Sequence, residues 1–362
     1  MDIKSTETLI FSAYMLACIL LFYYIIIEVY LYFAAIIVLY VLYRILSKQY
    51  VTKLEIKGQG VFITGCDTGI GHATALRLVK AGFTVFAGCL KPEDEGATAL
   101  MEKGGERLHV VPLDVTSDES VQHAFEMVKT GMPETGLWAV INNAGIEFAA
   151  EIEFATIEMM KRVAEVNFYG IVRVTKTFLP LLRKSKGRVV NVTSVKGRLG
   201  CPADSAYTCA KWAGEAFSDI LRREMYRFGV NVVIIEPGQF GNLTQILQGE
   251  RLRLAEDELN KCWELASEEI QEAYGRECID GLIKDFRDDS KSGPKSLDAV
   301  TEAMLDAVEN VNPKCRYLVH GTNMPCDKYC ITAVLNQYLP EYLMDYIYGW
   351  IVPLPPVKQQ VK

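Results

Sequence analysis

The chain has 362 residues, half of them hydrophobic, and a formal net charge of -7 at pH 7. This length allows one large domain with a well-buried core, and the acidic balance argues against nucleic acid as a partner because phosphate binding requires a basic surface. The ten cysteines form no C-x-x-C pair and the four histidines show no metal-ligand spacing, so we expect reduced thiols and no metal site.

The N-terminal segment is strongly apolar. Residues 9–27 carry no charge, and after Glu28 the uncharged run continues from residue 29 to residue 43. Nineteen helical residues span roughly 28 Å, close to the hydrocarbon thickness of a bilayer, but the whole run is nearly twice too long for one pass. We predict a membrane anchor over residues 1–46. It is a transmembrane helix or, as the length favours, a helical hairpin or one span plus an interfacial helix.

The charges around this segment indicate its orientation. The segment lacks the cleavage site of a secretory signal. It also contains acidic residues, in which a mitochondrial presequence is poor. We expect a membrane of the endoplasmic reticulum, with a mitochondrial membrane as the alternative, and the rest of the chain in the cytosol. The basic residues that favour this orientation by the positive-inside rule are Arg44, Lys48, Lys53 and Lys57.

Beyond a polar linker over residues 47–58, apolar runs alternate with amphipathic stretches. Strands that alternate with helices form a parallel sheet covered on both faces, so we predict an α/β fold with a doubly wound parallel sheet over residues 59–321. The strands are expected at 60–64, 83–87, 109–113, 137–142, 187–192 and 230–236, and helices at 70–81, 117–130, 156–184 and 206–228.

Two C-terminal segments differ from this pattern. Residues from about 240 to 290 are charged and helical, and they follow the sixth strand, where a doubly wound enzyme usually places a substrate lid. The alternative is a solvated helical face with no such role. Residues 322–362 form an aromatic tail that could cover an active site, dock on the membrane or pack in a dimer.

A glycine-rich turn, Thr64-Gly65-Cys66-Asp67-Thr68-Gly69-Ile70-Gly71, joins the first strand to the first helix of this domain. Glycines permit a tight turn and close approach to a pyrophosphate, while the helix N-terminus supplies N–H groups and positive potential. After the fourth strand comes Asn142-Asn143-Ala144-Gly145, where an open α/β sheet binds ligand. Both turns therefore indicate a dinucleotide site.

A third motif is Tyr207-Thr208-Cys209-Ala210-Lys211. Residues four apart on a helix share one face, so the phenol and the ammonium can meet one reactive centre. A tyrosine with a pKa near 10 is a poor base, but a nearby positive charge favours the phenolate. Ser194 lies thirteen residues upstream at the end of a predicted strand, and Asn167 lies on the preceding long helix.

These motifs, with Pro237-Gly238, occur in the order and spacing of the short-chain dehydrogenase/reductase superfamily, which the chain resembles over roughly residues 58–244. The resemblance implies a Rossmann-like sheet of seven strands and an NAD(P)-dependent oxidoreductase acting on CH–OH groups. The catalytic residues that it implies are Asn167, Ser194, Tyr207 and Lys211. The cofactor residues are Thr64, Gly65, Asp67, Gly69, Ile70, Gly71, Asp114, Asn142, Ala144, Gly145, Tyr207, Lys211, Pro237 and Gly238, and Ser194 and Tyr207 contact substrate.

The family roles are chemically specific. Tyr207 would take the proton of the substrate hydroxyl as hydride leaves for the nicotinamide, and Ser194 would hydrogen-bond the substrate oxygen. Lys211 would lower the phenol pKa and hold the ribose, and Asn167 would bind a water that links Lys211 to solvent. Asp114 would lie at the adenine side.

Within the superfamily the sequence is most similar to a membrane-associated branch that contains 17-beta-hydroxysteroid dehydrogenase type 2, retinol dehydrogenases and D-beta-hydroxybutyrate dehydrogenase. Residues 136–145 and 175–187 resemble the steroid enzyme, and residues 85–90, 163–167 and 215–219 resemble the hydroxybutyrate enzyme. A phosphate near Lys91 would meet more acidic than basic residues, and the glycine turn carries Asp67. We therefore favour NAD over NADP.

The substrate follows from similar reasoning. A small hydroxy acid requires a cation. Lys196 and Arg198 follow Ser194, but Asp204 stands where we expect the hydroxybutyrate branch to carry a basic residue. A membrane anchor and an aromatic tail favour a lipophilic steroid or retinoid alcohol, with D-beta-hydroxybutyrate as the alternative and Arg198 as its possible carboxylate partner. A non-enzymatic, cofactor-binding membrane scaffold is the other alternative, which the presence of Tyr207 and Lys211 disfavours. We also expect a homo-oligomer.

Overall fold

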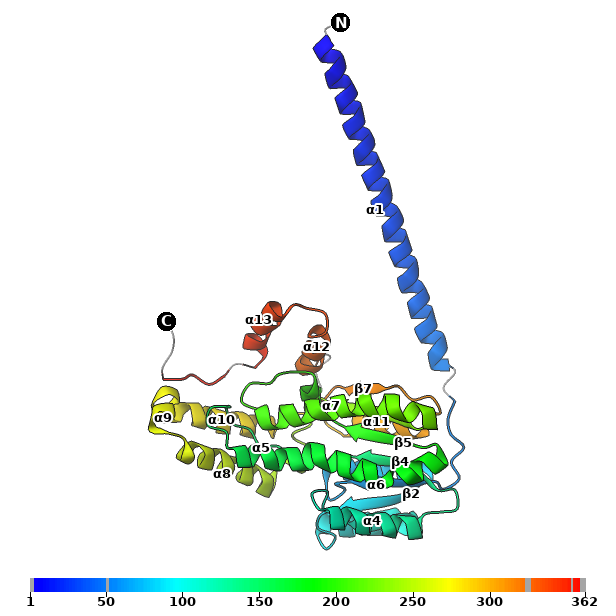
Figure 1. The fold of residues 1–362 in the computed structure, drawn as a ribbon, viewed down its shortest axis with the longest axis vertical. Helices are drawn as coiled ribbons and strands as arrows, with labels where there is room; N and C mark the ends of the chain where they lie inside the picture. The colour runs from blue at the N-terminus through cyan, green and yellow to red at the C-terminus, as the bar shows by residue number, and fades with distance from the viewer. Residues whose placement is uncertain (1–2, 50–51, 323–326, 353, 359–362) are drawn as a thin grey trace. The chain divides into compact units, whose positions relative to one another are not determined.

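The computed structural model describes residues 3–49, 52–322, 327–352 and 354–358. The chain divides into two compact units, Met1–Lys53 and Leu54–Lys362. Figure 1 shows the fold of both units, with the chain coloured from blue at the N-terminus to red at the C-terminus.

The first unit contains one helix, α1 (Ile3–Gln49), of 47 residues. Within it, Ser12–Tyr43 is long and apolar enough to cross a membrane by length and composition. The prediction of a helical hairpin is wrong, because α1 continues without a break. The reason lies in the sequence: residues 3–49 contain neither glycine nor proline, the residues that most readily interrupt a helix.

A parallel sheet of seven strands forms the centre of the second unit, in the order β3-β2-β1-β4-β5-β6-β7. The predicted doubly wound fold is confirmed, and the six predicted strands lie within two residues of the observed ones. The seventh, β7, had no predicted position. The strands are β1 (Gly60–Thr64), β2 (Thr84–Cys89), β3 (Leu108–Pro112), β4 (Leu137–Asn142), β5 (Arg188–Val192), β6 (Asn231–Pro237) and β7 (Arg316–Val319).

Successive side chains of the strands enter two different cores. Val61 and Ile63 of β1 pack in the core on one face of the sheet, whereas Phe62 packs in the core on the other. Strands buried on both faces read as continuous apolar runs, which is why they were recognisable in the sequence. One face is covered by α2 (Gly69–Ala81), α3 (Glu95–Gly104) and α11 (Asp298–Glu309), and the other by α4 (Asp118–Gly131), α6 (Gly170–Ser185) and α7 (Ser205–Met225).

The predicted helix over residues 156–184 consists of three consecutive parts. α5 (Ile157–Ala164) is followed by a π-helical turn, Glu165–Tyr169, which leads directly into α6. Asn167 lies in this turn and is fully buried. Such π-turns inside helices are frequent at functional sites.

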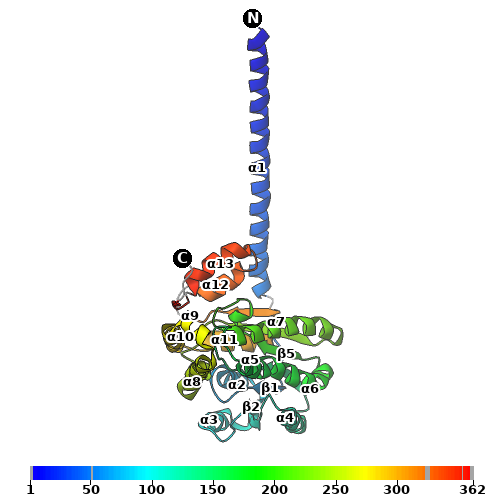
Figure 2. The ribbon, with the colours of Figure 1, turned by 60° about the vertical axis from the view of Figure 1, so that its left-hand side comes forward.

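The charged segment after β6 forms three helices, α8 (Gly249–Leu265), α9 (Glu268–Tyr274) and α10 (Arg276–Asp289), which Figure 2 shows gathered together. Their apolar side chains join a core with residues of α5 and α7 that includes Met159, Tyr207 and Trp263. The segment is therefore packed on one face rather than solvated all round. The tail forms α12 (Lys328–Leu335) and α13 (Glu341–Ile351), and Cys330 of α12 packs against Val195 and Leu199.

Candidate active site

A cleft with an empty volume of about 1490 Å³ lies at the carboxyl ends of the strands. The strand order reverses between β1 and β4, and an open α/β sheet binds its ligand at such a switch point. The turns that follow β1, β4, β5 and β6 all contribute to the lining. Four of the predicted motifs, separate in sequence, thus meet in one cavity.

The turn after β1 requires glycine at several positions. Gly65 and Gly69 have φ of 69° and 63°, the left-handed region that glycine adopts without strain. A Cβ at Gly71 would lie 2.3 Å from the carbonyl oxygen of Gly65. Gly65, Asp67, Gly69 and Ile70 line the cleft at the N-terminus of α2, whose first N–H groups and helix dipole suit an anion. These residues fit the pyrophosphate of a dinucleotide.

Two predicted cofactor residues, Thr64 and Gly71, are buried under this turn and hold its backbone in place. Thr64 is buried, and its hydroxyl accepts hydrogen bonds from the backbone N–H groups of Asn143 at 2.9 Å and Ala144 at 3.0 Å. Gly71 is buried and packs against Gly65. Thr64 and Gly71 therefore join the two turns to each other and are not among the residues that line the cleft.

Asp67 reaches the end of the second strand. Its carboxylate accepts hydrogen bonds from the backbone N–H groups of Leu90 at 3.2 Å and Lys91 at 3.0 Å, just beyond β2. An acid at this place is the usual partner of the adenosine ribose hydroxyls in NAD-binding folds. The sequence shows no acid directly after β2, but the fold brings the carboxylate of Asp67 there from the turn between β1 and α2.

The Asn142–Gly145 segment is divided between the core and the cleft. Asn142 is buried and donates to Thr175 Oγ1 at 2.9 Å and to Asn191 Oδ1 at 2.7 Å, so its side chain is not brought into the cleft. Asn143, which the sequence interpretation passed over, lines the cleft and donates to the carbonyl of Gly65 at 3.0 Å. Ala144 and Gly145 also line it, as do Asp114, Pro237 and Gly238 from other strands.

Tyr207, Lys211 and Ser194 come together at the centre of the cleft. Lys211 Nζ lies 5.3 Å from the centre of the Tyr207 ring and donates to the carbonyl oxygen of Val192 at 3.0 Å. Ser194 follows β5, and its hydroxyl accepts a hydrogen bond from the Lys196 N–H at 3.2 Å. The three side chains are buried yet line the cavity.

Asn167 stands behind this group. Its amide nitrogen donates to the carbonyl of Ile146 at 2.8 Å, and its Oδ1 accepts from the Ile146 N–H at 2.9 Å. Both ends of the amide thus hold the backbone of Ile146, which lines the cleft. The water expected between Asn167 and Lys211 stays a prediction.

Burial shifts the pKa values of Tyr207 and Lys211 in opposite directions. Burial raises the pKa of Tyr207 above its usual range, and Glu147 raises it further, while Lys196 and Ser194 lower it. Burial also lowers the pKa of Lys211 to about 8, against the opposing effect of Glu147 and Glu215. Removal of the phenol from water therefore outweighs the opposing effect of Lys196 on the pKa of Tyr207, and the lowering expected from Lys211 stays a prediction.

A second cation near the phenol was absent from the predicted site. Lys196 Nζ lies 5.4 Å from the centre of the Tyr207 ring and forms ion pairs of 2.7 Å with both Glu147 and Asp204. In the sequence, only its position two residues after Ser194 indicated that Lys196 would lie near the phenol. An adjoining cavity with an empty volume of about 630 Å³ is lined by the same lysine and by Ala149, Leu282, Phe286, Val352 and Leu354.

Comparison with known proteins agrees with this geometry. Residues 59–253 match the protein-family model described as short chain dehydrogenase. D-beta-hydroxybutyrate dehydrogenase, mitochondrial, of Mus musculus is 39% identical over 80% of this chain and 84% of its own length. Retinol dehydrogenase 7 of Mus musculus is 37% identical over 88% and 96%, and 17-beta-hydroxysteroid dehydrogenase type 6 of Homo sapiens is 37% identical over 90% and 98%. A solved short-chain dehydrogenase from Streptomyces avermitilis has the same fold, with a TM-score of 0.58, 23% identity and coverage of 82% and 93%.

Proposed function

The chain belongs to the short-chain dehydrogenase family, and from this premise we propose that it oxidises the alcohol group of a neutral, lipophilic molecule, a steroid or a retinoid, with NAD. As a member of this family it is an oxidoreductase that acts on CH–OH groups and uses a nicotinamide cofactor. The identity of the alcohol, the choice of NAD and the role of each residue are proposals.

The residues of the cleft divide the reaction among them. A bound nicotinamide would accept the hydride from the carbinol carbon. Tyr207 Oη takes the hydroxyl proton, and the Ser194 hydroxyl holds the substrate oxygen at the angle that this transfer needs. Lys211 stabilises the phenolate by its charge, and Asp67 binds the adenosine ribose. With Ser194, Tyr207 and Lys211 all facing one cavity, the alternative of a catalytically silent scaffold has no support.

The pairing of the cations beside Ser194 supports a neutral substrate. Arg198 forms two hydrogen bonds of 2.6 and 2.7 Å with Glu236, and Lys196 is held by Glu147 and Asp204. A small hydroxy acid would need one of these cations for its carboxylate, and separating a buried ion pair is costly. The alternative substrate, D-beta-hydroxybutyrate, is supported by a relative at 39% identity, but not by the charges at this site.

A substrate panel tests the proposal. The full-length chain in detergent or proteoliposomes is assayed by absorbance of the reduced cofactor, with NAD and with NADP, on estradiol, retinol and 3-hydroxybutyrate. We expect turnover with NAD on at least one of the lipophilic alcohols and none on the hydroxy acid. Turnover confined to 3-hydroxybutyrate would rule out the proposed substrate class.

The mechanism is tested separately by Tyr207→Phe. Loss of the general base is expected to lower kcat by about 10²- to 10⁴-fold while leaving binding of the reduced cofactor, followed by its fluorescence, close to wild type. Wild-type turnover in this variant would show that another group takes the proton.

The setting of the enzyme is also part of the proposal. Helix α1 serves as a membrane anchor. The proposed membrane is that of the endoplasmic reticulum, with the catalytic unit in the cytosol. Helices α8 to α10 form the substrate lid. The lid helices support this because their core includes Tyr207, and the apolar stretch Ser12–Tyr43 supports the anchor. We expect a homo-oligomer, which size-exclusion chromatography with light scattering would test.

A further inference from the structure

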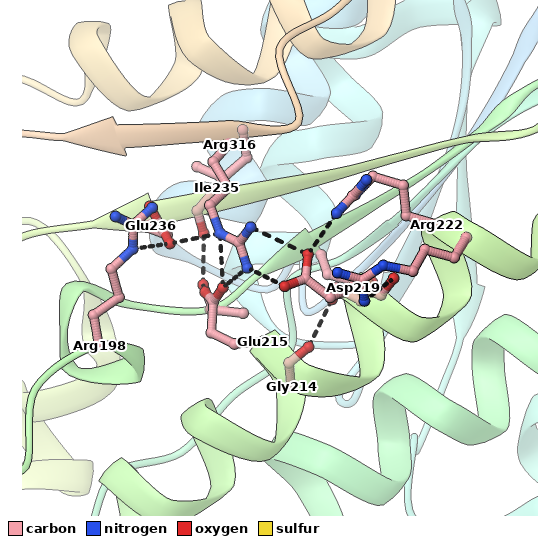
Figure 3. Close-up of polar contacts among 12 residues, drawn as sticks. Arg198, Gly214, Glu215, Asp219, Arg222, Ile235, Glu236 and Arg316 are labelled. Atoms are coloured by element: carbon pink, nitrogen blue, oxygen red, sulfur yellow. Dashed lines mark hydrogen bonds and ion pairs between the residues drawn. The ribbon is translucent and has the colours of Figure 1, made fainter. Parts of the chain in front are cut away.

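A group of charges, of which Glu215 and Glu236 are buried, lies outside the lining of the cleft and is centred on Arg316 of β7 (Figure 3). Arg316 of β7 forms ion pairs with Glu215 at 2.9 Å and Asp219 at 3.0 Å, and its Nε lies 3.4 Å from Glu236. The side chain of Glu236 is 0% exposed and that of Glu215 is 9% exposed. We call this set the rear charge network, and its members are Arg198, Glu215, Asp219, Glu236 and Arg316.

The segments that carry Lys211, Ser194 and Pro237 each contact or adjoin a member of this network. Glu215 follows Lys211 by one helical turn on the same face of α7, and it accepts a 2.5 Å hydrogen bond from Thr193, the residue before Ser194. The short helical turn after Ser194 lies against it, since a Cβ at Gly197 would be 3.0 Å from Glu215 Cγ. Glu236 directly precedes Pro237, which lines the cleft.

We propose that Glu215 is a positioning residue for the dehydrogenase reaction. Its carboxylate holds the Thr193–Ser194 segment against α7 and favours the charged form of Lys211, while the ion pair with Arg316 fixes the position of Glu215. This proposal rests on the roles proposed above for Ser194, Tyr207 and Lys211. It adds a residue that does not line the cleft and that acts through two residues which do.

The charged groups around Lys211 and Glu215 determine how loss of the Glu215 charge should change the pH dependence of the reaction. Lys211 faces Glu147 from the loop after β4 and Tyr207 and Glu215 from its own helix, and Glu147 and Glu215 both raise its pKa. Glu215 in turn faces Arg316 from β7 and Glu236 from β6. The guanidinium of Arg316, 2.9 Å from the Glu215 carboxylate, supplies the opposite charge that a buried ion requires.

The direction of the pH effect follows from these contacts. Lys211 stabilises the phenolate only below its own pKa, which burial has lowered to about 8. Removing the charge of Glu215 lets this pKa fall further. The alkaline limb of kcat/KM should therefore move to lower pH in Glu215→Gln.

Asp219 provides a matched control. It lies one further turn along α7, is 26% exposed, and pairs with the same Arg316 and with Arg222. The Thr193 hydroxyl donates to Glu215 and to the carbonyl oxygen of Ile235, and Asp219 is not among the groups that shift the pKa of Lys211. A role confined to bracing α7 against β7 would affect the two carboxylates alike.

The experiment measures kcat, KM and their pH profiles for the full-length wild type, Glu215→Gln, Glu215→Asp and Asp219→Asn, with Tm for each. We expect Glu215→Gln to lower kcat about tenfold, as small misplacements of reacting groups do, and to move the alkaline limb down by roughly half a pH unit or more. Glu215→Asp should restore part of the shift, and Asp219→Asn should keep the wild-type limb. Equal pH profiles in Glu215→Gln and Asp219→Asn, with a lowered Tm in both, would overturn the proposal.

A second variant covers the case in which Glu215→Gln does not fold. Thr193→Val removes the hydroxyl that Glu215 binds but leaves every charge in place, so kcat should fall several-fold with the alkaline limb unchanged. Wild-type kcat in Thr193→Val would overturn the positioning of Ser194. Neither result depends on the general base, because failure of the proposed mechanism itself would appear as full activity in Tyr207→Phe.

Discussion

At the scale of single residues, Asp67 shows how one side chain can connect the ends of two strands. It belongs to the turn after β1, yet its carboxylate accepts N–H groups from Leu90 and Lys91 beyond β2. Lys91 is directed instead to Asp94, at 3.9 Å, and is largely exposed. A 2′-phosphate in this place would meet the carboxylate of Asp67, whereas a ribose hydroxyl could donate to it.

The variant Asp67→Asn tests this account of cofactor choice. Loss of the charge should lower kcat/KM for NAD by roughly 10- to 100-fold, the value of a hydrogen bond to a charged acceptor, and should raise kcat/KM for NADP. Initial rates with both cofactors give the ratio. The control is Asp94→Asn, an exposed acid a few residues after β2, which should leave the ratio unchanged; an unchanged ratio in Asp67→Asn would contradict the role.

The residues of the site were predictable where one local spacing fixes them. Tyr207 and Lys211 share a helix face whatever surrounds them, and the structure places them together. Asn142 and Asn143 are a different case, because adjacent residues of a strand point to opposite faces. Asn142 pairs with Asn191 across β4 and β5 and so enters the core. Lys196 owes its orientation to Glu147 and Asp204, which no local pattern connects to it.

At the scale of elements, the strands and long helices followed from periodicity, while short or unusual elements did not. β7 has four residues and no distinguishing pattern. The length of the apolar run suggested two membrane elements, but a bilayer thickness does not itself break a helix, and α1 is continuous. The charged lid segment showed helical periodicity in its sequence, and its buried face became evident only from its packing on α5 and α7.

Helix α13 carries a row of exposed aromatic side chains. Tyr342, Tyr346 and Trp350 recur every four residues and are 71%, 66% and 77% exposed, whereas Met344 on another face is buried. Aromatic rings with a polar edge suit the headgroup level of a bilayer. Because the chain also has a helix fit to cross a membrane, we propose that this row contacts lipid rather than a second copy of the chain.

Fluorescence quenching in proteoliposomes tests the row. Brominated lipids should quench part of the tryptophan emission of the full-length chain, and this part should disappear in Trp350→Phe because the residue at the lipid has been removed. Trp212 on α7 is 46% exposed and serves as the control, since Trp212→Phe should leave the quenched fraction in place. Equal quenching with and without Trp350 would place the row away from lipid, and a change in oligomeric state on its substitution would favour a dimer contact.

At the scale of the whole molecule, the second unit begins earlier in the chain than the polar composition suggests. Residues 47–58 were expected to form a linker, but Leu54 and Ile56 pack against the core beside β1, and the Leu54 N–H donates to the carbonyl of Glu309 at 2.7 Å. The second unit accordingly begins at Leu54. A truncation that respects this boundary should fold without α1.

Two truncated chains, 54–362 and 59–362, make this testable together with the anchor. Full-length protein should stay in the membrane pellet through alkaline carbonate, while 54–362 should be released and retain turnover on the alcohol that the full-length chain oxidises. The chain 59–362 lacks Leu54 and Ile56, whose partial burial contributes about 2 kcal/mol, so its Tm should be lower by roughly 2 to 6 °C. Release of the full-length chain by carbonate would show that α1 does not span the bilayer, and equal Tm values would show that the second unit begins after Ile56.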